Sequence, residues 1–281
     1  MISPIRFCKG NRVNITESEF KSRWVRQQVL EMISSAGRGH IGGSLSATDL
    51  LVALYHGKLL RYDSSNPKWN ERDRFIMSKG HSVEALYAVL ADVGFFDVEL
   101  LLTYGQDGSI LGGHPDHLIS GVEVATGSLG HGLGIAAGLA LAAKLDELPY
   151  TTVVMLGDGE CYEGSVWESA IFSSKNNLNQ LVAILDWNHQ ATLETTAALE
   201  PMKAKWEAFE WETKEIDGHS FEEIAAAWQY IKERESNKPI ILLANTIKGK
   251  GISFMEKSLK WHHNVPKGND LIMARQELMN G

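Results

Sequence analysis

Three predominantly apolar runs in the second half of the chain constrain its fold more than any other feature. They cover residues 151–156 (TTVVML), 181–187 (LVAILDW) and 239–247 (PIILLANTI). Segments with helical periodicity lie between and beside them, at residues 164–176 and 221–234. Strands that are apolar on both faces and alternate with helices form a parallel sheet covered by helices on each side. The sequence therefore predicts an α/β fold.

The first half of the chain carries weaker signals of the same kind. Thr16 and Glu19 have the spacing of a capping box and predict the start of a helix that ends near Gly37. The further predicted segments are a helix at 48–55, a strand at 74–78, a helix at 82–93 and a helix of small residues at 130–145. No repeat, low-complexity tract or linker interrupts the sequence, so we expect residues 1–281 to form a single domain.

Charge and composition exclude several classes of function. The 281 residues carry a formal net charge of −8, which argues against a nucleic-acid partner. No apolar stretch approaches the roughly 18 residues of a membrane span, and the N-terminus lacks the apolar core of a signal peptide. Cys8 and Cys161 lie far apart, without a metal-binding spacing, as suits a reducing compartment. We expect a cytoplasmic protein that binds neither membranes nor nucleic acid.

The most specific local signal is the sequence Gly157-Asp158-Gly159, directly after the first of the three apolar runs. Asn188 follows the next run, so both polar residues are expected at the carboxyl ends of neighbouring parallel strands, where ligands of such sheets bind. Carboxylate and amide oxygens suit magnesium beside a phosphate group. The alternative is a strand-end turn without a ligand.

A second glycine-rich segment, Gly127-Ser128-Leu129-Gly130, comes directly before the helix of small residues. A helix N-terminus presents free amide groups and the positive end of the helix dipole, and it can therefore bind an anion. A plain helix cap without a ligand is the alternative reading of this segment.

Histidines recur in predicted glycine-rich loops. They are His40, His81, His114 and the pair His262 and His263 after Trp261. Several such loops indicate a shared ligand, with imidazoles available for proton transfer near neutral pH. The remaining histidines at positions 56, 117, 189 and 219 have no such context, and we expect them to be structural.

These segments together resemble the transketolase family, from about residue 20 to about residue 265 and in the family's order. The matching motifs are GRGHIGGSLSATDLL, SKGHSVEALYAVL, GGHPD, GVEVATGSLGHGLG, GDGECYEG, DWN and TIKGKGISFME followed by WHH. The resemblance implies the thiamine-diphosphate-binding fold, a parallel sheet with helices on both faces. The deoxyxylulose-phosphate synthase branch of such enzymes differs around His81 and after Gly159.

The resemblance also implies the cofactors, thiamine diphosphate and Mg²⁺, for which Ca²⁺ or Mn²⁺ can substitute. It gives Asp158, Asn188 and the backbone carbonyl of Gln190 as metal ligands. The remaining cofactor-binding residues that it implies are His81, Gly127, Leu129, Gly157 and His262, with Leu129 contacting the aminopyrimidine ring through its backbone.

For catalysis, the resemblance implies that His40, His114 and His262 line the substrate channel, where they assist proton transfers and bind hydroxyl groups of the ketose. Glu163 and Glu168 resemble carboxylates of a hydrogen-bonded network that joins two cofactor sites. Three departures from the family pattern, at Ile41, His131 and His263, bear on the choice of sugar.

Full-length members of the family are about twice this length and carry a pyrimidine-binding domain and a C-terminal domain. We therefore expect the diphosphate-binding subunit of a split transketolase, which forms an α2β2 heterotetramer with a C-terminal transketolase subunit. The activity implied is transfer of a two-carbon ketol unit from a ketose, expected to be phosphorylated, to an aldose.

Three alternatives stay open at this point. One is a non-catalytic cofactor-binding or regulatory module, which the retained histidines His40 and His114 disfavour. Another is a transketolase specialised for an unusual anionic sugar. The third is a subunit of a different thiamine-dependent enzyme such as a dehydrogenase, in which the SKGH and GGHPD loops would be missing.

Overall fold

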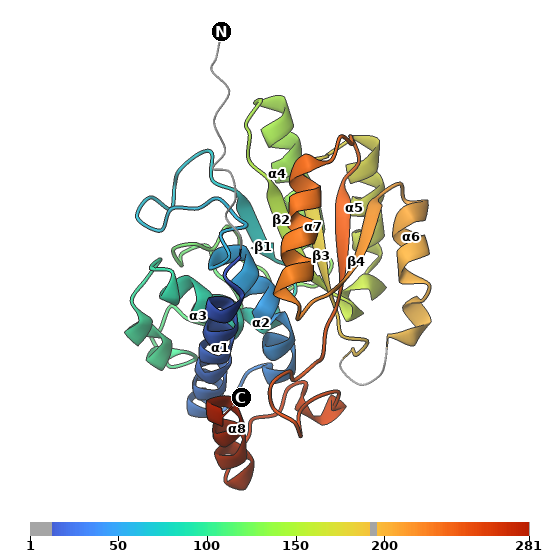
Figure 1. Ribbon diagram of the computed structural model, residues 1–281. Coiled ribbons are helices and arrows are strands. Elements are labelled where there is room, and N and C mark those ends of the chain that lie inside the picture. The colour runs from blue at the N-terminus through green and yellow to red at the C-terminus, as the bar shows by residue number, and fades with distance from the viewer. Residues whose placement is uncertain (1–12, 192–195, 281) are drawn as a thin grey trace.

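A parallel five-stranded sheet lies at the centre of the computed structural model, which describes residues 13–191 and 196–280 (Figure 1). The strand order is β1-β2-β3-β5-β4, and each neighbouring pair runs parallel. The strands are β1 (Arg74–Met77), β2 (Thr152–Gly157), β3 (Leu181–Trp187), β4 (Glu212–Asp217) and β5 (Ile240–Asn245). The parallel sheet expected from the apolar runs is confirmed.

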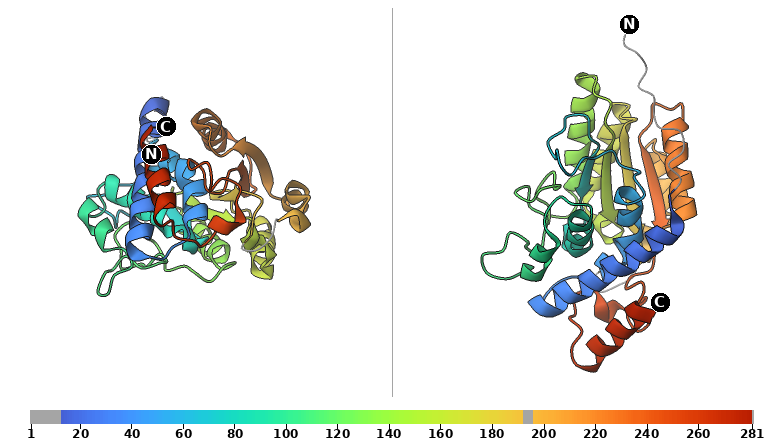
Figure 2. Two further views of the ribbon diagram at one scale, coloured as in Figure 1. Left: turned by 90° about the horizontal axis from the view of Figure 1, so that it is seen from below. Right: turned by 60° about the vertical axis from the view of Figure 1, so that its left-hand side comes forward.

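Helices cover both faces of this sheet. The described helices are α1 (Ile15–Ala36), α2 (Ile41–Tyr55), α3 (Val83–Asp92), α4 (Gly132–Leu145), α5 (Gly164–Lys175), α6 (Met202–Ala208), α7 (Phe221–Glu233) and α8 (Asn269–Asn280). Residues of α1, α2, α3 and α7 build the core on one face, and residues of α4, α5 and α6 build the core on the other. α8 lies across α1, where the Gln27 side chain donates a hydrogen bond to the Leu278 carbonyl at 2.9 Å (Figure 2).

The two cores arise from the alternation of side chains along each strand. In β2, Val153 and Met155 point into the core of α1, α2, α3 and α7, whereas Val154 and Leu156 point into the opposite core. All six residues of β2 are buried. A strand buried on both faces is apolar at most positions, which explains the predominantly apolar runs.

Two predicted helix starts were wrong. The N-cap of α1 is Asn14, whose side-chain oxygen accepts a hydrogen bond from the Glu17 amide, so the capping box at Thr16 is not used. α2 begins at Ile41, seven residues before the predicted start, and the glycine-rich segment after His40 is its first turn. A Cβ at Gly42 would lie 2.7 Å from the Trp261 carbonyl oxygen. Glycine is needed there for a close approach of two backbones, which outweighs its low helix propensity.

The sequence analysis did not predict β4, α6 or α8. β4 reads ETKEID, and only Ile216 within it is buried. It lies at the edge of the sheet, where charged side chains face water and the apolar signal of a central strand is lost. The described part of the chain contains no helix long and apolar enough to cross a membrane. Cys161 is a free, buried thiol, and Cys8 lies outside the described residues.

Burial on both faces of the sheet predicts a steep cost for truncation in the central strand. Leu185 in β3 is fully buried, and Leu102 is 71% exposed. We expect Leu185→Ala to lower the free energy of unfolding by about 2–5 kcal/mol, because it leaves a cavity in the core. Leu102→Ala makes the same chemical change at the surface and should cost less than about 0.5 kcal/mol. Urea unfolding of the two variants measures this difference, and equal losses would contradict the two-core arrangement.

Candidate functional site

A pocket of about 290 Å³ opens at the carboxyl edge of the sheet. Its wall includes one residue that closely follows each of four strands: Lys79 after β1, Asp158 after β2, Asn188 after β3 and Lys248 after β5. Parallel alignment places these four loops at one edge, the usual ligand site of such sheets. The volume suits a small organic ligand or part of a larger one.

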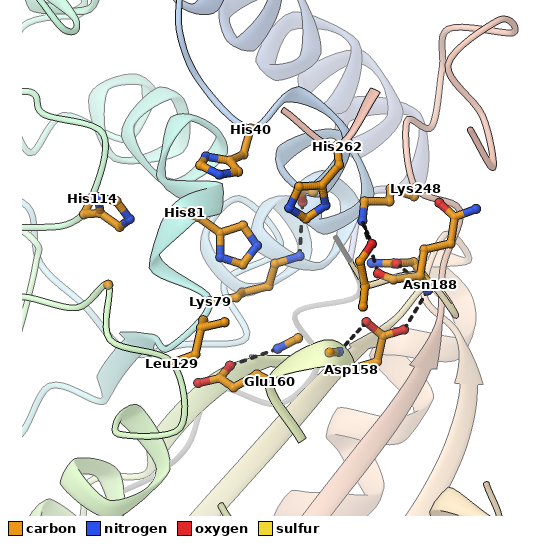
Figure 3. Close-up of a pocket in the computed structure, with 16 residues that line it drawn as sticks. His40, Lys79, His81, His114, Leu129, Asp158, Glu160, Asn188, Lys248 and His262 are labelled. Atoms are coloured by element: carbon orange, nitrogen blue, oxygen red, sulfur yellow. Dashed lines mark hydrogen bonds between the residues drawn. The ribbon is translucent and has the colours of Figure 1, made fainter. Parts of the chain in front are cut away.

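Most residues that the sequence analysis selected line this pocket (Figure 3). They are His40, His81, His114, Gly127, Leu129, Gly157, Asp158, Asn188, Gln190 and His262. They come from segments spread over more than 220 positions of the chain, and the fold brings them together. Glu163 and Glu168 do not line the pocket, because they lie exposed at the start of α5.

Asp158 and Asn188 converge at one end of the pocket. The backbone amide of Gln190 lies 3.2 Å from Asp158 Oδ2 and 3.2 Å from Asn188 Oδ1, so the two oxygens approach the same point. Burial, followed by the nearby charge of Asp186, raises the pKa of Asp158. A cation would relieve both effects.

In the described parts of the chain, no group of three or more His, Cys, Asp or Glu side chains could hold a metal ion. A cation at the Asp158 end would therefore have one carboxylate together with neutral oxygens from Asn188 and the backbone. Hard cations such as Mg²⁺ accept this set when a phosphate group completes it. The residues present thus fit a magnesium ion bound beside a diphosphate.

Four histidines occupy the other part of the pocket. His40 is the N-cap residue of α2, and its ring centroid lies 5.1 Å from that of His81 and 5.6 Å from that of His262. His114 packs against Gly127, where an added Cβ would lie 3.0 Å from the His114 ring. Figure 3 shows His40 and His114 on the side away from Asp158 and Asn188.

The imidazoles of His40, His81 and His262 are held in the neutral form. Burial, together with the neighbouring histidine and lysine charges, lowers the pKa of His40 to about 4. Burial and the charge of Lys248 lower the pKa of His262 to about 3. The pKa of His81 is also well below its ordinary value, first because of burial and then because of Lys79. A neutral imidazole can both donate and accept a hydrogen bond, and the buried Nδ1 of His262 has no partner within the described residues.

Lys248 is a pocket cation that the sequence analysis missed. Its ammonium group donates to the carbonyl oxygens of Gln190 and Ala191, at 3.1 and 3.2 Å. Burial, followed by the charge of Lys79, lowers its pKa to about 8. No carboxylate in the described residues forms an ion pair with Lys248, so its charge is available to an anionic ligand. The motif TIKGKG contains this lysine and was the one signal in the sequence that could have pointed to it.

Asp186 ties four segments together beneath the pocket. Its buried carboxylate forms an ion pair with Lys79 and accepts hydrogen bonds from Ser46 in α2, at 2.7 Å, and from Thr246 after β5. Burial alone would raise the pKa of Asp186, but the Lys79 charge and these hydrogen bonds hold it below its ordinary value. The carboxylate therefore stays ionised and holds Lys79, Ser46 and Thr246 in place beneath the pocket.

Glu160 has a similar role among the glycine loops. It accepts hydrogen bonds from the Gly130 amide at 2.8 Å, the Gly157 amide at 3.1 Å and the Ser78 hydroxyl. These donors belong to the three loops that carry Leu129, Asp158 and Lys79. Burial raises the pKa of Glu160, and the three hydrogen bonds oppose that rise.

The histidines expected to be structural lie outside the pocket lining. The clearest case is His219, whose Nδ1 lies 2.6 Å from the Asp49 carboxylate and whose Nε2 accepts a hydrogen bond from the Ile247 amide at 2.8 Å. It therefore joins α2 to the segment after β5, which leads to Lys248. His117 is exposed.

Comparison with known proteins relates the chain to transketolases. A family model described as the transketolase thiamine diphosphate binding domain matches residues 21–279. The chain is 43% identical over 263 residues to an apulose-4-phosphate transketolase subunit from Phocaeicola vulgatus, covering 92% of this chain and 93% of that protein. It is 44% identical over 243 residues to a 6-deoxy-6-sulfo-D-fructose transketolase subunit from Clostridium sp., covering 85% and 88%.

Transketolases with longer chains are also similar. The chain is 38% identical to the transketolase of Homo sapiens over 242 residues, which are 85% of this chain and 38% of the human protein. The crystal structure of transketolase from Campylobacter jejuni superposes with a TM-score of 0.88 at 31% identity, covering 95% of this chain and 43% of that one. With its fold and nearly its whole length matched, this chain belongs to the family of transketolase thiamine-diphosphate-binding domains.

Proposed function

We propose that this chain is the diphosphate-binding, catalytic subunit of a two-chain transketolase, which transfers a two-carbon ketol unit from a ketose to an aldose. The observation that carries this proposal is the gathering of the predicted cofactor and substrate residues in one pocket, with only Glu163 and Glu168 outside it. The high identity to transketolase subunits along nearly their whole length supports the same activity.

The metal end of the pocket would hold Mg²⁺, or Ca²⁺ or Mn²⁺ in its place. Its ligands would be the Asp158 carboxylate, the Asn188 amide oxygen and the Gln190 carbonyl oxygen. That carbonyl already accepts a hydrogen bond from Lys248, but a carbonyl oxygen has two lone pairs and can serve both.

Around the metal, Gly127, Gly157, His81 and His262 would contact the diphosphate of thiamine diphosphate, with Lys248 supplying a compensating charge. The unpaired Nδ1 of His262 is one polar atom that such a ligand would satisfy. The backbone of Leu129 would meet the aminopyrimidine ring.

The bound cofactor supplies the nucleophilic carbon and the electron sink that carbon–carbon cleavage needs. His40, His114 and His262 would bind hydroxyl groups of the sugars and carry protons to and from them. Neutral imidazoles suit this role, because each ring has one nitrogen that donates and one that accepts. The crowded ring cluster also limits the water that reaches the reacting carbon.

A separate C-terminal subunit would supply the pyrimidine-binding wall of the active site. Relatives of this length are named as subunits, which implies a second chain in those enzymes, whereas this chain spans 38% of the human enzyme. We propose that residues 1–281 form one diphosphate-binding domain and that two copies join two partner chains as an α2β2 heterotetramer.

The outer face of α4 and α5 suits such an assembly. Ile135 on α4, Ile171 and Phe172 on α5, and Tyr162 just before α5 are 37–50% exposed, and a contact with another chain would bury these apolar side chains. Glu163 and Glu168 lie in the same region. Around a two-fold axis equivalent residues approach each other, so these glutamates would link the two cofactor sites.

The substrates that we propose are sugars with an anionic group. Related subunits are named for a sugar phosphate and for a sulfonated sugar, and the cationic pocket suits both classes. The retained histidine cluster disfavours a non-catalytic module. We place the protein in the cytoplasm, since its described cysteine is a free, buried thiol.

The metal assignment predicts that Asp158→Asn weakens magnesium-dependent binding of thiamine diphosphate, because it removes the carboxylate charge at an oxygen ligand. We expect a loss of affinity at least as large as the roughly 10–100-fold that an outer-shell substitution costs. Calorimetry with the partner subunit present measures it. Asp107→Asn at an exposed loop position is the matched control, and an unchanged affinity in Asp158→Asn would remove the assignment.

The assembly predicts that the chain alone transfers no ketol group, because one wall of the active site is missing, and that adding the C-terminal subunit restores transfer. Ile171→Asp should lower the mass of the complex in analytical ultracentrifugation, since it places a charge in the α4–α5 face. Ile272→Asp on α8 is a control with similar exposure, 54% against 50%. Ordinary turnover by the purified chain alone would refute the two-chain proposal.

The neutral histidines predict acid-sensitive folding of the ligand-free chain. Unfolded imidazoles bind protons near pH 6.5, whereas His40 does so near pH 4 and His262 near pH 3 in the folded chain. Between pH 6.5 and 4 the unfolded state therefore holds more protons, and the free energy of unfolding should decrease as the pH falls. Urea unfolding of a His40→Gln/His262→Gln variant should show a shallower decrease than the parent. His117→Gln is the control, and parallel curves for parent and double variant would contradict this explanation.

A further inference from the structure

His263 does not line the pocket, yet its ring is the nearest aromatic neighbour of His40. The two ring centroids are 4.4 Å apart and the rings are tilted by 56°. The rings of His81 and His262, which do line the pocket, are farther from His40, at 5.1 and 5.6 Å. The side chain of His263 is exposed, so it stands at the solvent side of the pocket, beside His40.

The ring nitrogens of His263 have no partner in the described parts of the chain. Its contact with His40 is a ring contact, and no hydrogen bond or ion pair involves its side chain there. By contrast, both ring nitrogens of His219 have hydrogen-bond partners, the Asp49 carboxylate and the Ile247 amide. His263 is therefore positioned by packing, while its polar atoms remain available to a ligand that enters past His40.

The position of the His263 side chain determines which part of a bound ligand it could contact. Figure 3 shows the pocket running from Asp158 and Asn188 at one end to His40 and His114 at the other. If the diphosphate occupies the first end, the sugar enters from the second. His263 is exposed and lies beside the partly buried His40, with the two ring centroids 4.4 Å apart. A group that contacts His263 therefore lies nearer to the solvent than one that contacts His40.

The electrostatics at this end favour an anion. The pKa of His40 falls to about 4, first through burial and then through the charges of His263, His114, Lys248 and Lys79. Among the described lining residues the carboxylates are Asp158 and Glu160, and Asp158 lies at the far end. A negative group near His263 would meet imidazole donors and these positive charges. The nearby carboxylate of Glu84 is buried and already accepts hydrogen bonds from the His40 amide and from the hydroxyl groups of Ser44 and Tyr104, at 3.3, 2.6 and 2.7 Å.

We infer that His263 is a specificity-determining residue that donates a hydrogen bond to the anionic group on the distal carbon of the ketose, beyond the two carbons that are transferred. The inference rests on the proposed function and adds to it the residue of this chain that selects phosphorylated or sulfonated ketoses over neutral ones. In this arrangement His40 contacts the transferred two-carbon unit, and His263 contacts the anionic group at the distal end of the same substrate.

The test compares fructose 6-phosphate with fructose as donor, in the complex with the partner subunit and with a common aldose acceptor. The two donors differ only in the phosphate. His263→Gly should lower kcat/KM for fructose 6-phosphate by about tenfold through KM, the size expected for one hydrogen bond to a charged group. The value for fructose and kcat for both donors should change less than about twofold. His263→Gln keeps an N–H donor and should retain a large part of the discrimination.

His117→Gly is the matched control, because His117 is an exposed histidine outside the pocket. A second readout does not need turnover: the NMR signals of the His263 ring should shift on addition of fructose 6-phosphate and not of fructose. Equal losses for both donors, or no loss for either, would overturn the role of His263 while ketol transfer by the parent upholds the proposed function. A parent complex without any ketol transfer would overturn both.

Discussion

The buried ion pair between Lys79 and Asp186 is the interaction on which the pocket depends. Both side chains are almost wholly excluded from water, so neither charge is tolerable without the other. The hydrogen bonds that Asp186 accepts from Ser46 and Thr246 extend the pair to α2 and to the segment after β5. One carboxylate thus fixes four parts of the chain that are distant in sequence. The nearby carboxylate of Glu160 does the same for the glycine loops. The charges of Asp158 and Asp186 also oppose the lowering of the Lys248 pKa and so favour its protonated form.

The sequence predicted the central part of the fold because burial on both faces leaves a local trace. The runs of β2, β3 and β5 are predominantly apolar, and each was located to within two residues. Elements at the sheet edge, or stabilised by contacts with distant parts of the chain, have no such local sequence pattern. β4 is an edge strand with charged residues facing water. The first turn of α2 contains glycines because it touches the backbone of a segment more than 200 positions away, and no local pattern encodes that contact.

The residues of the site also fall into two groups, those that the sequence predicted and those that it missed. Residues with distinctive chemistry in glycine-rich contexts, such as Asp158 and His114, were found from the sequence, and the family resemblance added their order. Lys79 and Lys248 were missed because a lysine is usually a solvated surface residue. Only the structure shows that one is paired beneath the pocket and that the other has lost its water without gaining a carboxylate. The exposed positions of Glu163 and Glu168 are equally invisible to motif reasoning, since a motif carries no information about which wall of a site a side chain belongs to.

The two-chain arrangement that we propose is compatible with this fold, because each face of the sheet has its own buried core. The two apolar clusters lie on the two faces of one sheet, and their members are buried within this chain. What stays open is the pocket mouth and the apolar outer face of α4 and α5, both of which are surfaces. Association then joins surfaces that are already folded. This costs less conformational entropy than binding in which a core must first be completed by the partner. It also leaves His263, at the mouth of the pocket, free to differ between subunits without altering the residues that we propose bind the cofactor. Sugar specificity can therefore change at the mouth without disturbing the carboxylates that hold the pocket together.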